Sequence, residues 1–201
     1  NNVLKTFSIE NEPVVELVNN REREYIFADL PDIGYSTDID TVMASSYQVK
    51  KQLQQIVKIE QPITNTLLYK RILRIWNLTR VTTRLQVFID NLLEDAYKDP
   101  LSGDTIIYWE DEEKAKDCDF YRINSKRDIL DIPILEVMSA ARYAIEQQIS
   151  MPTEDLKRLT SQLLGFSRKG NNLDMVTEQT IQLLVDQGIF SHANGMVSMN
   201  N

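Results

Sequence analysis

The chain has 201 residues, of which 42% are hydrophobic and 26% are charged, proportions typical of a soluble globular protein. Its formal net charge of -8 argues against a generic nucleic-acid-binding protein, because such domains usually carry a basic surface. No apolar run approaches the length of about 20 residues that spans a bilayer and no signal-peptide pattern opens the chain, so we expect no membrane partner. The single cysteine, Cys118, excludes an intramolecular disulfide and indicates a cytoplasmic setting.

Residues 1–44 carry acidic residues, two prolines and Gly34 without a sustained helical period, and we interpret them as an extended lead-in or linker. Two short apolar stretches, residues 14–18 and 25–30, are candidates for edge strands or for packing onto the next unit. The chain starts with asparagine instead of methionine. We therefore expect it to be a piece of a longer protein.

A first unit is expected over residues 45–127, beginning with three helices. The first starts at Ser45 or Ser46 as N-cap and ends near Glu60, before a proline. Asn65 is expected to cap the second helix, and a turn over residues 77–81 leads to the third. Apolar residues recur at helical spacing on one side of each helix: Val49, Leu53, Ile56 and Val57 in the first; Leu68, Ile72, Ile75 and Trp76 in the second; Leu85, Phe88, Ile89, Leu92 and Leu93 in the third.

Two β-rich stretches follow, at residues 104–109 and 118–123, with a polar loop over 110–117. Three helices followed by a β-hairpin are the layout of a winged helix. The pattern thus predicts that these two stretches pair as the wing.

The second unit, residues 128–201, repeats this order. Pro133 stands near the start of a first helix, Pro152 and Thr153 introduce a second, and residues 165–170 form a turn before the third. The chain closes with two strand-like stretches around Asn194-Gly195, a pair that favours a tight hairpin turn. The predicted fold class is α+β, mainly helical, with tandem winged-helix repeats, each a helix-turn-helix plus a β-hairpin.

The two units are related by an internal repeat at an offset of 88 residues, the sign of a duplicated structural module. Leu68 matches Leu156, Leu78 matches Phe166, Arg80 matches Arg168 and Leu85 matches Leu173. Charge differs between the copies. Residues 65–89 hold five basic residues and no acidic one, whereas residues 153–177 hold four basic and three acidic residues. The first copy is the better candidate for an anionic partner.

The segments 61–85 and 163–173 resemble a domain of unknown function at the carboxyl end of very large bacterial proteins that join a superfamily 1 helicase to a Vsr-like endonuclease. The resemblance covers roughly residues 26–199. Its motif is an apolar or aromatic pair, an arginine, then small or polar residues and a second arginine. The matching positions are Trp76, Leu78, Arg80 and Arg84 in the first copy and Leu164, Phe166, Arg168 and Gly170 in the second, which departs at Asn172, where the family tends to have the second arginine. The resemblance implies an accessory module used in DNA processing or in defence against foreign DNA.

The candidate DNA-contacting residues are Lys70, Arg71, Arg74 and Arg84, since arginine and lysine supply most phosphate contacts. The alternative is a solvated basic face. The third helix weakens the DNA interpretation, because its outward positions include Asp90, Asn91, Glu94 and Asp95, and carboxylates are repelled by a phosphate backbone. Sequence-specific recognition is not expected.

Arg80 and Arg168 occupy the same place although the charges around them diverge. This favours a structural role, such as bonding the carbonyls at the end of the second helix, over contact with a ligand. The aromatic and aliphatic residues of the motif are expected to serve packing instead of base stacking: Trp76, Leu78, Leu164, Phe166 and also Trp109.

No residue set indicates catalysis, a cofactor or a metal. His192 has no second histidine or cysteine beside it, and Cys118 lacks a supporting base. The acidic stretch over residues 110–119 is better interpreted as a solvated loop than as a cation site, and residues 165–170 lack the lysine and hydroxyl residue of a phosphate loop.

Two functions remain open. The first is a non-catalytic accessory module of a helicase-nuclease that contacts DNA non-specifically through the first unit. The alternative is a protein-interaction module that docks onto the parent enzyme or a partner. A winged helix can do either, so the fold alone does not decide.

Overall fold

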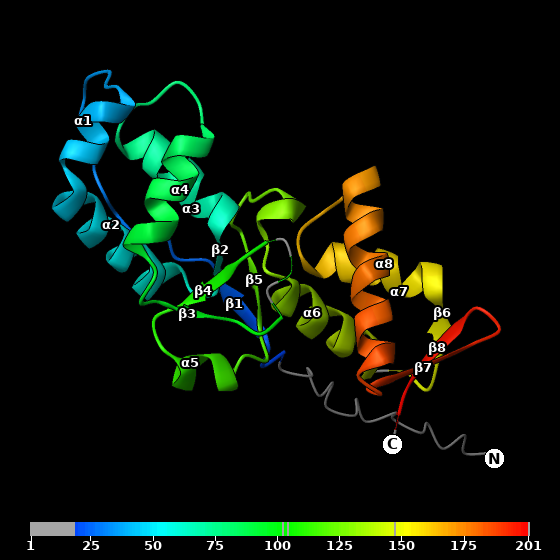
Figure 1. Cartoon of the computed structure of the whole chain (residues 1–201). Helices are drawn as coiled ribbons and strands as arrows, with labels where there is room; N and C mark the ends of the chain where they lie inside the picture. Colours follow the sequence, from blue (N-terminus) through cyan, green and yellow to red (C-terminus); the bar gives the residue numbers. More distant parts are fainter. Residues whose placement is uncertain (1–18, 102, 104, 147, 201) are drawn as a thin grey trace, which may run out of the picture.

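The structure is a computed structural model that describes residues 19–101, 103, 105–146 and 148–200, and its described part is an α+β protein (Figure 1). Eight α-helices are described within these ranges. In chain order the elements are β1 (Glu22–Glu24), α1 (Ile39–Ala44), α2 (Ser46–Glu60), β2 (Ile63–Thr64), α3 (Asn65–Ile75), α4 (Thr83–Leu92), β3 (Tyr97–Lys98), β4 (Ile107–Trp109), α5 (Glu112–Lys116), β5 (Tyr121–Ile123), the 3-10 helix η1 (Ile129–Asp131), α6 (Ile134–Glu146), β6 (Met151–Pro152), α7 (Thr153–Leu163), α8 (Asn171–Asp186), β7 (Phe190–Ala193) and β8 (Met196–Met199).

The first unit packs α2, α3 and α4 around one apolar core, with a small sheet at its edge. The sheet has the order β2-β4-β3, and both pairings are antiparallel. The apolar side of each helix faces the core as its spacing predicts. Fully buried side chains include Val49, Leu53, Ile72, Leu85 and Ile89.

The second unit has the same arrangement. Helices α6, α7 and α8 pack together, and the sheet order β6-β8-β7 has antiparallel pairings throughout. The final hairpin turns at Asn194 and Gly195, whose φ angles are 52° and 75°. Positive φ at both central residues is what a type I′ turn requires. The hairpin expected at this position is therefore confirmed.

The offset of the sequence repeat also relates the secondary-structure elements. The first residues of α2 and α6 are 46 and 134, those of β2 and β6 are 63 and 151, those of α3 and α7 are 65 and 153, and those of α4 and α8 are 83 and 171. Each pair is separated by 88 residues. The two final strands of each unit do not keep this spacing, so the copies diverge after the third helix.

The hairpin predicted for the first unit is wrong in one strand. Strand β5 lies within residues 118–123 but does not pair with β4; it pairs in parallel with β1 of the lead-in. The partner of β4 is β3, which the sequence analysis did not expect. The residues between β4 and β5 form the helix α5, because Asp111 caps it by accepting a hydrogen bond from the Lys114 N–H at 2.9 Å.

The helix starts also differ in one detail. Thr64, and not Asn65, is the N-cap of α3, since its hydroxyl accepts a hydrogen bond from the Leu67 N–H at 3.2 Å. Asn65 is the first residue of the helix. A threonine one residue before an asparagine also offers a capping oxygen, so composition alone could not separate them.

The described part of the lead-in is more ordered than an extended linker. It contains β1 and the short helix α1, which Asp38 caps through the Thr41 N–H at 2.8 Å. Between them the chain runs beside α3: Ile33 donates its N–H to the Ile75 carbonyl at 3.0 Å. Tyr25 is buried against the core of the first unit. The apolar stretch at residues 14–18 lies outside the described residues.

A buried ionic cluster joins the two units. We call it the junction cluster, and it consists of Glu60, Arg122, Arg127 and Glu136. Arg122, on β5, donates to the carbonyls of Glu60 and Pro62 at the end of α2, at 2.7 and 2.6 Å. It also donates to the Glu136 carboxylate on α6. One guanidinium thus bonds the first helix of the first unit and the first helix of the second unit.

The remaining contacts of the junction cluster leave its carboxylates fully paired. Arg127 forms a two-pronged ion pair with Glu136, at 2.8 and 2.9 Å. Glu60 accepts from the Tyr25 hydroxyl at 2.6 Å and pairs with Arg71 at 2.9 Å. Both carboxylates have no exposed surface. Burial by itself would raise the pKa of Glu136, but the charges and hydrogen bonds of Arg122 and Arg127 hold it below the usual range.

Candidate nucleic-acid interface

Two of the four candidate DNA-contacting residues are held by buried carboxylates from other parts of the chain. Lys70 pairs with Asp131 of η1 at 2.7 Å, although 56% of its side chain is exposed. Arg71 pairs with Glu60, donates to the Ala28 carbonyl at 2.6 Å, and is only 12% exposed. Arg71 therefore has a structural role in the junction between α3, α2 and the lead-in. Lys70 still presents part of its side chain to solvent.

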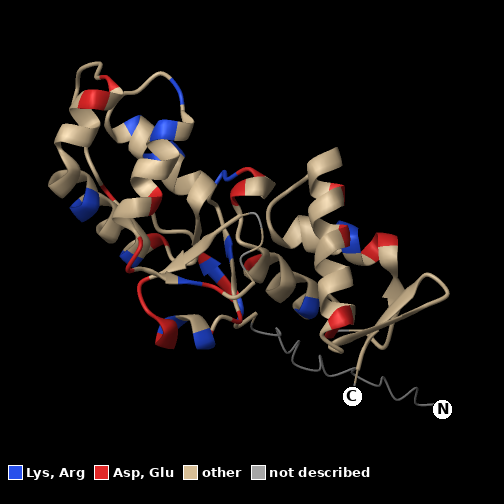
Figure 2. Cartoon of the chain, viewed as in Figure 1, with Lys and Arg blue, Asp and Glu red and all other residues tan. Residues whose placement is uncertain are grey.

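The other two candidates lie near the turn between α3 and α4. Arg84 pairs with Asp40 at 2.7 Å, and more than half of each side chain is exposed, so the pair contributes little stability and a competing anion can replace the carboxylate. Arg74 is exposed, and its side chain has no hydrogen-bonding or charged partner among the described residues. Figure 2 shows basic residues gathered around this turn, with acidic residues at the start of α1 beside them. The basic surface is therefore local and mixed in sign.

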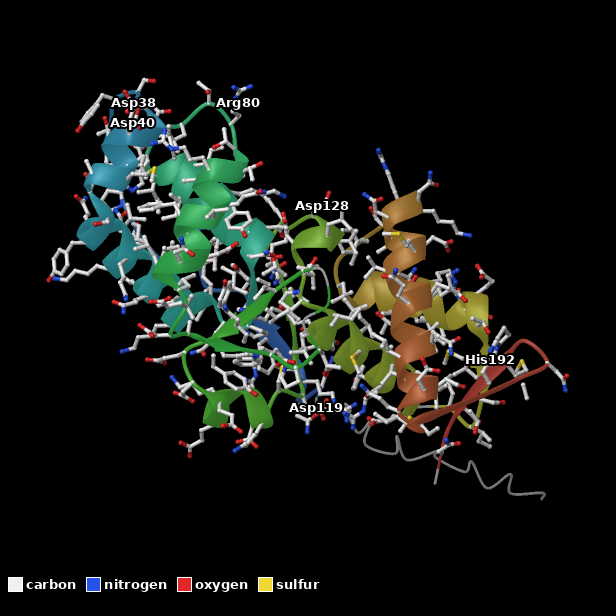
Figure 3. All side chains as sticks on the ribbon, in the orientation of Figure 1. Asp38, Asp40, Arg80, Asp119, Asp128 and His192 are labelled. Carbon is white, nitrogen blue, oxygen red and sulfur yellow. The ribbon has the colours of Figure 1, made fainter. Side chains whose placement is uncertain are left out.

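Arg80 and Arg168 do not have the structural role that the sequence analysis favoured. Both side chains are exposed, and within the described part of the chain neither makes a hydrogen bond or an ion pair. Figure 3 shows Arg80 on the loop between α3 and α4, at the outer end of the first unit. The expectation that these arginines bond the last carbonyls of α3 and α7 is wrong.

Backbone groups satisfy those carbonyls in both copies. After α3, Asn77 has a φ of 48° and the Leu78 N–H donates to the Leu73 carbonyl at 2.9 Å. After α7, Gly165 has a φ of 89° and the Phe166 N–H donates to the Ser161 carbonyl at 2.9 Å. This is the Schellman pattern, in which a left-handed residue lets the next N–H reach back to the helix. No arginine is needed to end either helix.

The apolar members of the repeated motif serve packing, as predicted. Trp76 and Trp109 are buried, and Leu164 is buried in the second unit. Leu78 and Phe166 are partly buried against the cores of their units. The two tryptophans are accordingly not available to stack on bases.

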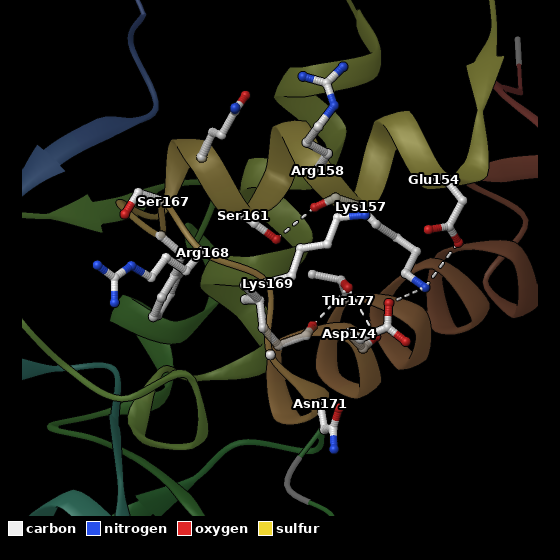
Figure 4. A pocket seen from close by; sticks show the side chains of 14 residues that line it. Glu154, Lys157, Arg158, Ser161, Ser167, Arg168, Lys169, Asn171, Asp174 and Thr177 are labelled. Carbon is white, nitrogen blue, oxygen red and sulfur yellow. Dashed lines mark hydrogen bonds and ion pairs between the residues drawn. The ribbon is translucent and has the colours of Figure 1, made fainter.

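A pocket of about 470 Å³ opens at the turn between α7 and α8 (Figure 4). Lys157 lies in it and pairs with Glu154, Asp174 and Glu178 at 3.2, 2.6 and 3.1 Å. Burial would lower the pKa of Lys157, but hydrogen bonds to the three carboxylates raise it above the usual value. Figure 4 shows the guanidinium of Arg168 pointing away from this group of charges. The pocket thus combines an internally paired lysine with a free arginine at its rim.

The outward face of each third helix is centred on an apolar residue. Val87 of α4 is 54% exposed and Met175 of α8, at the equivalent position, is 45% exposed. Asp90 does not simply face solvent: it accepts hydrogen bonds from the hydroxyls of Tyr69 and Tyr108, at 2.7 and 3.4 Å. This carboxylate, expected to repel a phosphate backbone, is thus hydrogen-bonded to side chains of the first unit.

The residues considered for catalysis or metal binding are separated. His192 is exposed in β7, where its ring lies 3.1 Å from the Thr153 hydroxyl. Burial raises the pKa of the Cys118 thiol to about 12. Asp119 pairs with Arg21 and Arg142, and among the residues that the structure describes no group of three or more side chains is placed to hold a metal ion. Nor is any described helix long and apolar enough to cross a bilayer.

Sequence comparison finds one family for part of the chain. A family described as a protein of unknown function (DUF3320) matches residues 44–87, a stretch that contains α2 and α3 and the first turn of α4. Neither the curated proteins nor the solved structures contain a match. The finding agrees with a domain of unknown function and covers the part of the first unit that holds Arg74, Arg80 and Arg84.

Proposed function

We propose that this chain is a non-catalytic accessory module made of two winged-helix units, and that the first unit contacts DNA through phosphates without reading sequence. Both units have the order helix, strand, helix, helix, strand, strand, and in both the first strand pairs with the last. This order agrees with that expected of a winged helix, in which a helix-turn-helix is followed by a β-hairpin. The proposal of a winged helix rests on that match of element order and strand order.

The observation that carries the DNA proposal is the exposure of Arg80, with no internal partner, at the turn of the helix-turn-helix. In this class of motif the start of the third helix enters or borders the DNA groove, and residues of the turn lie close to phosphates. Arg74 lies on the other side of the same turn and is also free. Arg84 follows in the first turn of α4, where only an exposed ion pair holds it.

The contact is expected to be non-specific. The outward face of α4 offers Val87 and Asn91 but no set of side chains that could form paired hydrogen bonds to successive bases. Binding that depends on phosphates alone is strong only at low salt, because its free energy comes largely from released counterions.

We further propose that the chain is part of a larger enzyme that acts on DNA. The resemblance to carboxyl-terminal domains of bacterial proteins that join a helicase to an endonuclease supports a role as an accessory module of such an enzyme. The family match over residues 44–87 is consistent with it. In this context the module would hold the enzyme on DNA while other domains supply the chemistry.

The test is fluorescence anisotropy of the chain with duplex, forked and single-stranded DNA over a salt series. We expect binding that weakens with salt, and the double variant Arg74→Gln with Arg80→Gln should lower the slope of log K against log salt by about 2 on duplex DNA. Lys116→Gln is the matched control, since it removes one charge from the exposed end of α5. A lack of binding at low salt would overturn the proposal.

A second candidate function is docking onto a protein, and the exposed Val87 and Met175 favour it. They occupy equivalent positions at the centre of the third helix in the two units, where a partner could cover them. The face of α8 also carries Asp174, Glu178 and Asp186, which suit a basic protein surface better than DNA. If docking is the function, Val87→Asp should reduce binding to the rest of the parent chain and leave DNA binding unchanged.

A further inference from the structure

The turns that carry the shared arginine lie on the same side of the molecule. In Figure 1, α4 and α8 both begin at the upper side of the view and run downward. The turn with Arg80 precedes α4 and the turn with Arg168 precedes α8. Both arginines are exposed and unpaired within the described residues. The loops that carry the two arginines thus lie at the same end of the third helix in each unit.

The junction cluster keeps these two turns in a set arrangement. Arg122 bonds carbonyls at the end of α2 and the carboxylate of Glu136 on α6. Both ends of this link are buried, and Arg127 ties the same carboxylate back to the segment after β5. Buried ion pairs of this kind are costly to break. A rigid connection of this type fixes the relative orientation of two weak contact sites before binding. Binding of both sites to one ligand then loses less conformational entropy.

The second unit has the charge for a weak phosphate contact at its turn. Arg168 and Lys169 are adjacent and exposed, while Asp174 and Glu178 in the same pocket pair with Lys157, which Glu154 also shares. The unit lacks counterparts of Arg74 and Arg84, because Gln162 and Asn172 stand at those positions. Its contribution should therefore be smaller than that of the first unit.

From these observations we infer that both units contact one DNA duplex at the same time, the first through Arg80 and its neighbours and the second through Arg168 and Lys169. This inference rests on the proposed DNA-binding function. It adds that the second unit is a second phosphate contact on the same duplex. The partner is then a DNA duplex long enough to contact both the turn before α4 and the turn before α8.

The experiment compares hairpin-closed duplexes of two lengths. A unit of about 80 residues has a radius of gyration of about 12 Å, so a duplex of about 8 base pairs, or about 27 Å, spans one unit only. A duplex of about 20 base pairs, or about 70 Å, can reach both. Binding of the chain and of its Arg80→Gln, Arg168→Gln and Lys116→Gln variants is measured by anisotropy over a salt series on each duplex.

The inference predicts a steeper salt dependence on the long duplex than on the short one. Arg168→Gln should lower the slope on the long duplex by about 0.9 and leave the short duplex unaffected, whereas Arg80→Gln should lower both. If Arg168→Gln behaves like Lys116→Gln while Arg80→Gln still weakens binding, the second contact is refuted and the proposed function stands. If no form of the chain binds either duplex, the proposed function itself fails.

Discussion

Replacing Glu136 with glutamine should lower the free energy of unfolding, because it breaks the buried ion pairs that link the two units. Glu136 has no exposed surface and accepts hydrogen bonds from both Arg122 and Arg127. The glutamine side chain has nearly the same size, so packing is retained while two buried guanidinium groups lose their counter-charge. Removing one partner of a buried ion pair typically costs about 3–5 kcal/mol, which is a large share of the roughly 5–15 kcal/mol that stabilises a domain.

The corresponding change in melting temperature follows from chain length. A protein of this size loses about 2–4 °C for each kcal/mol, so Glu136→Gln should lower the melting temperature by roughly 6–20 °C. Calorimetry and urea unfolding measure the two quantities. Glu112→Gln is the matched control, because Glu112 forms an exposed ion pair with Lys116 that contributes only about 0.5 kcal/mol. A loss below about 1 kcal/mol in Glu136→Gln would refute the assignment of the junction cluster as the link between the units.

Three further outcomes are expected. Because the pKa of Glu136 is held below its usual range by its two arginines, its pairing stabilises the fold above the unfolded pKa of about 4.3. That stability is lost as pH falls through the lower folded pKa, so acid unfolding followed by circular dichroism should be less steep in Glu136→Gln. The Cys118 thiol, with its pKa raised to about 12 by burial and by the charge of Glu136, should react with a disulfide reagent at neutral pH about a thousandfold more slowly in the folded chain than in urea; equal rates would contradict its burial. Arg71→Gln should destabilise the chain by about 2–4 kcal/mol in urea unfolding because it leaves the buried Glu60 carboxylate without its ion-pair partner, whereas Arg74→Gln should change stability by less than about 0.5 kcal/mol.

The longer helices could be predicted from the sequence because their signals are local, whereas the short helices α1 and α5 were expected as lead-in and loop. Apolar residues at helical spacing and an offset of 88 residues place α2, α3 and α4 and their counterparts in the second unit within a residue or two. The closing hairpin was equally accessible, since Asn194-Gly195 has few alternatives to a tight turn. In each case the determining residues lie within a few positions of one another.

Strand partners could not be predicted in the same way. The stretch at residues 118–123 has the composition of a strand, and β5 does form there. Its partner is nevertheless β1, about a hundred residues earlier in the chain, and the nearer β4 pairs with β3. Composition shows that a segment is suited to a sheet but carries no information about which distant edge receives it.

Sequence periodicity also does not predict which basic side chains of the candidate site are free. Arg71 and Arg74 both lie away from the apolar side of α3, and helical spacing treats them alike. In the structure Glu60 and the Ala28 carbonyl bind Arg71, whereas Arg74 remains free. Those partners come from α2 and from the lead-in. The availability of a basic residue is thus decided by tertiary contacts that periodicity does not contain.

A comparison of the two units shows which features duplication preserved inside the fold. In the first unit the Tyr69 hydroxyl of α3 donates to Asp90 of α4 at 2.7 Å. In the second, Lys157 of α7 pairs with Glu178 of α8 at 3.1 Å, and both residues stand 88 positions after their counterparts. The donor changed from a neutral hydroxyl to an ammonium group, yet a carboxylate on the third helix still bonds the second helix. At this position the charge of the donor therefore differs between the two units, while the bond between the second and third helices is kept.

Arg80 and Arg168 match between the two units although neither side chain makes a bond within the described part of the chain. The two copies end their second helix with the same backbone pattern, so Arg80 and Arg168 have no part in that turn. They also take no part in the link between the second and third helices. A long charged side chain that is exposed and unpaired contributes little to folding, so internal packing gives no reason for the same residue to stand at this position in both units. Contact with an anionic partner outside the chain supplies such a reason, and for that reason Arg80 and Arg168, more than Lys70 or Arg71, are the residues on which the DNA-binding proposal depends.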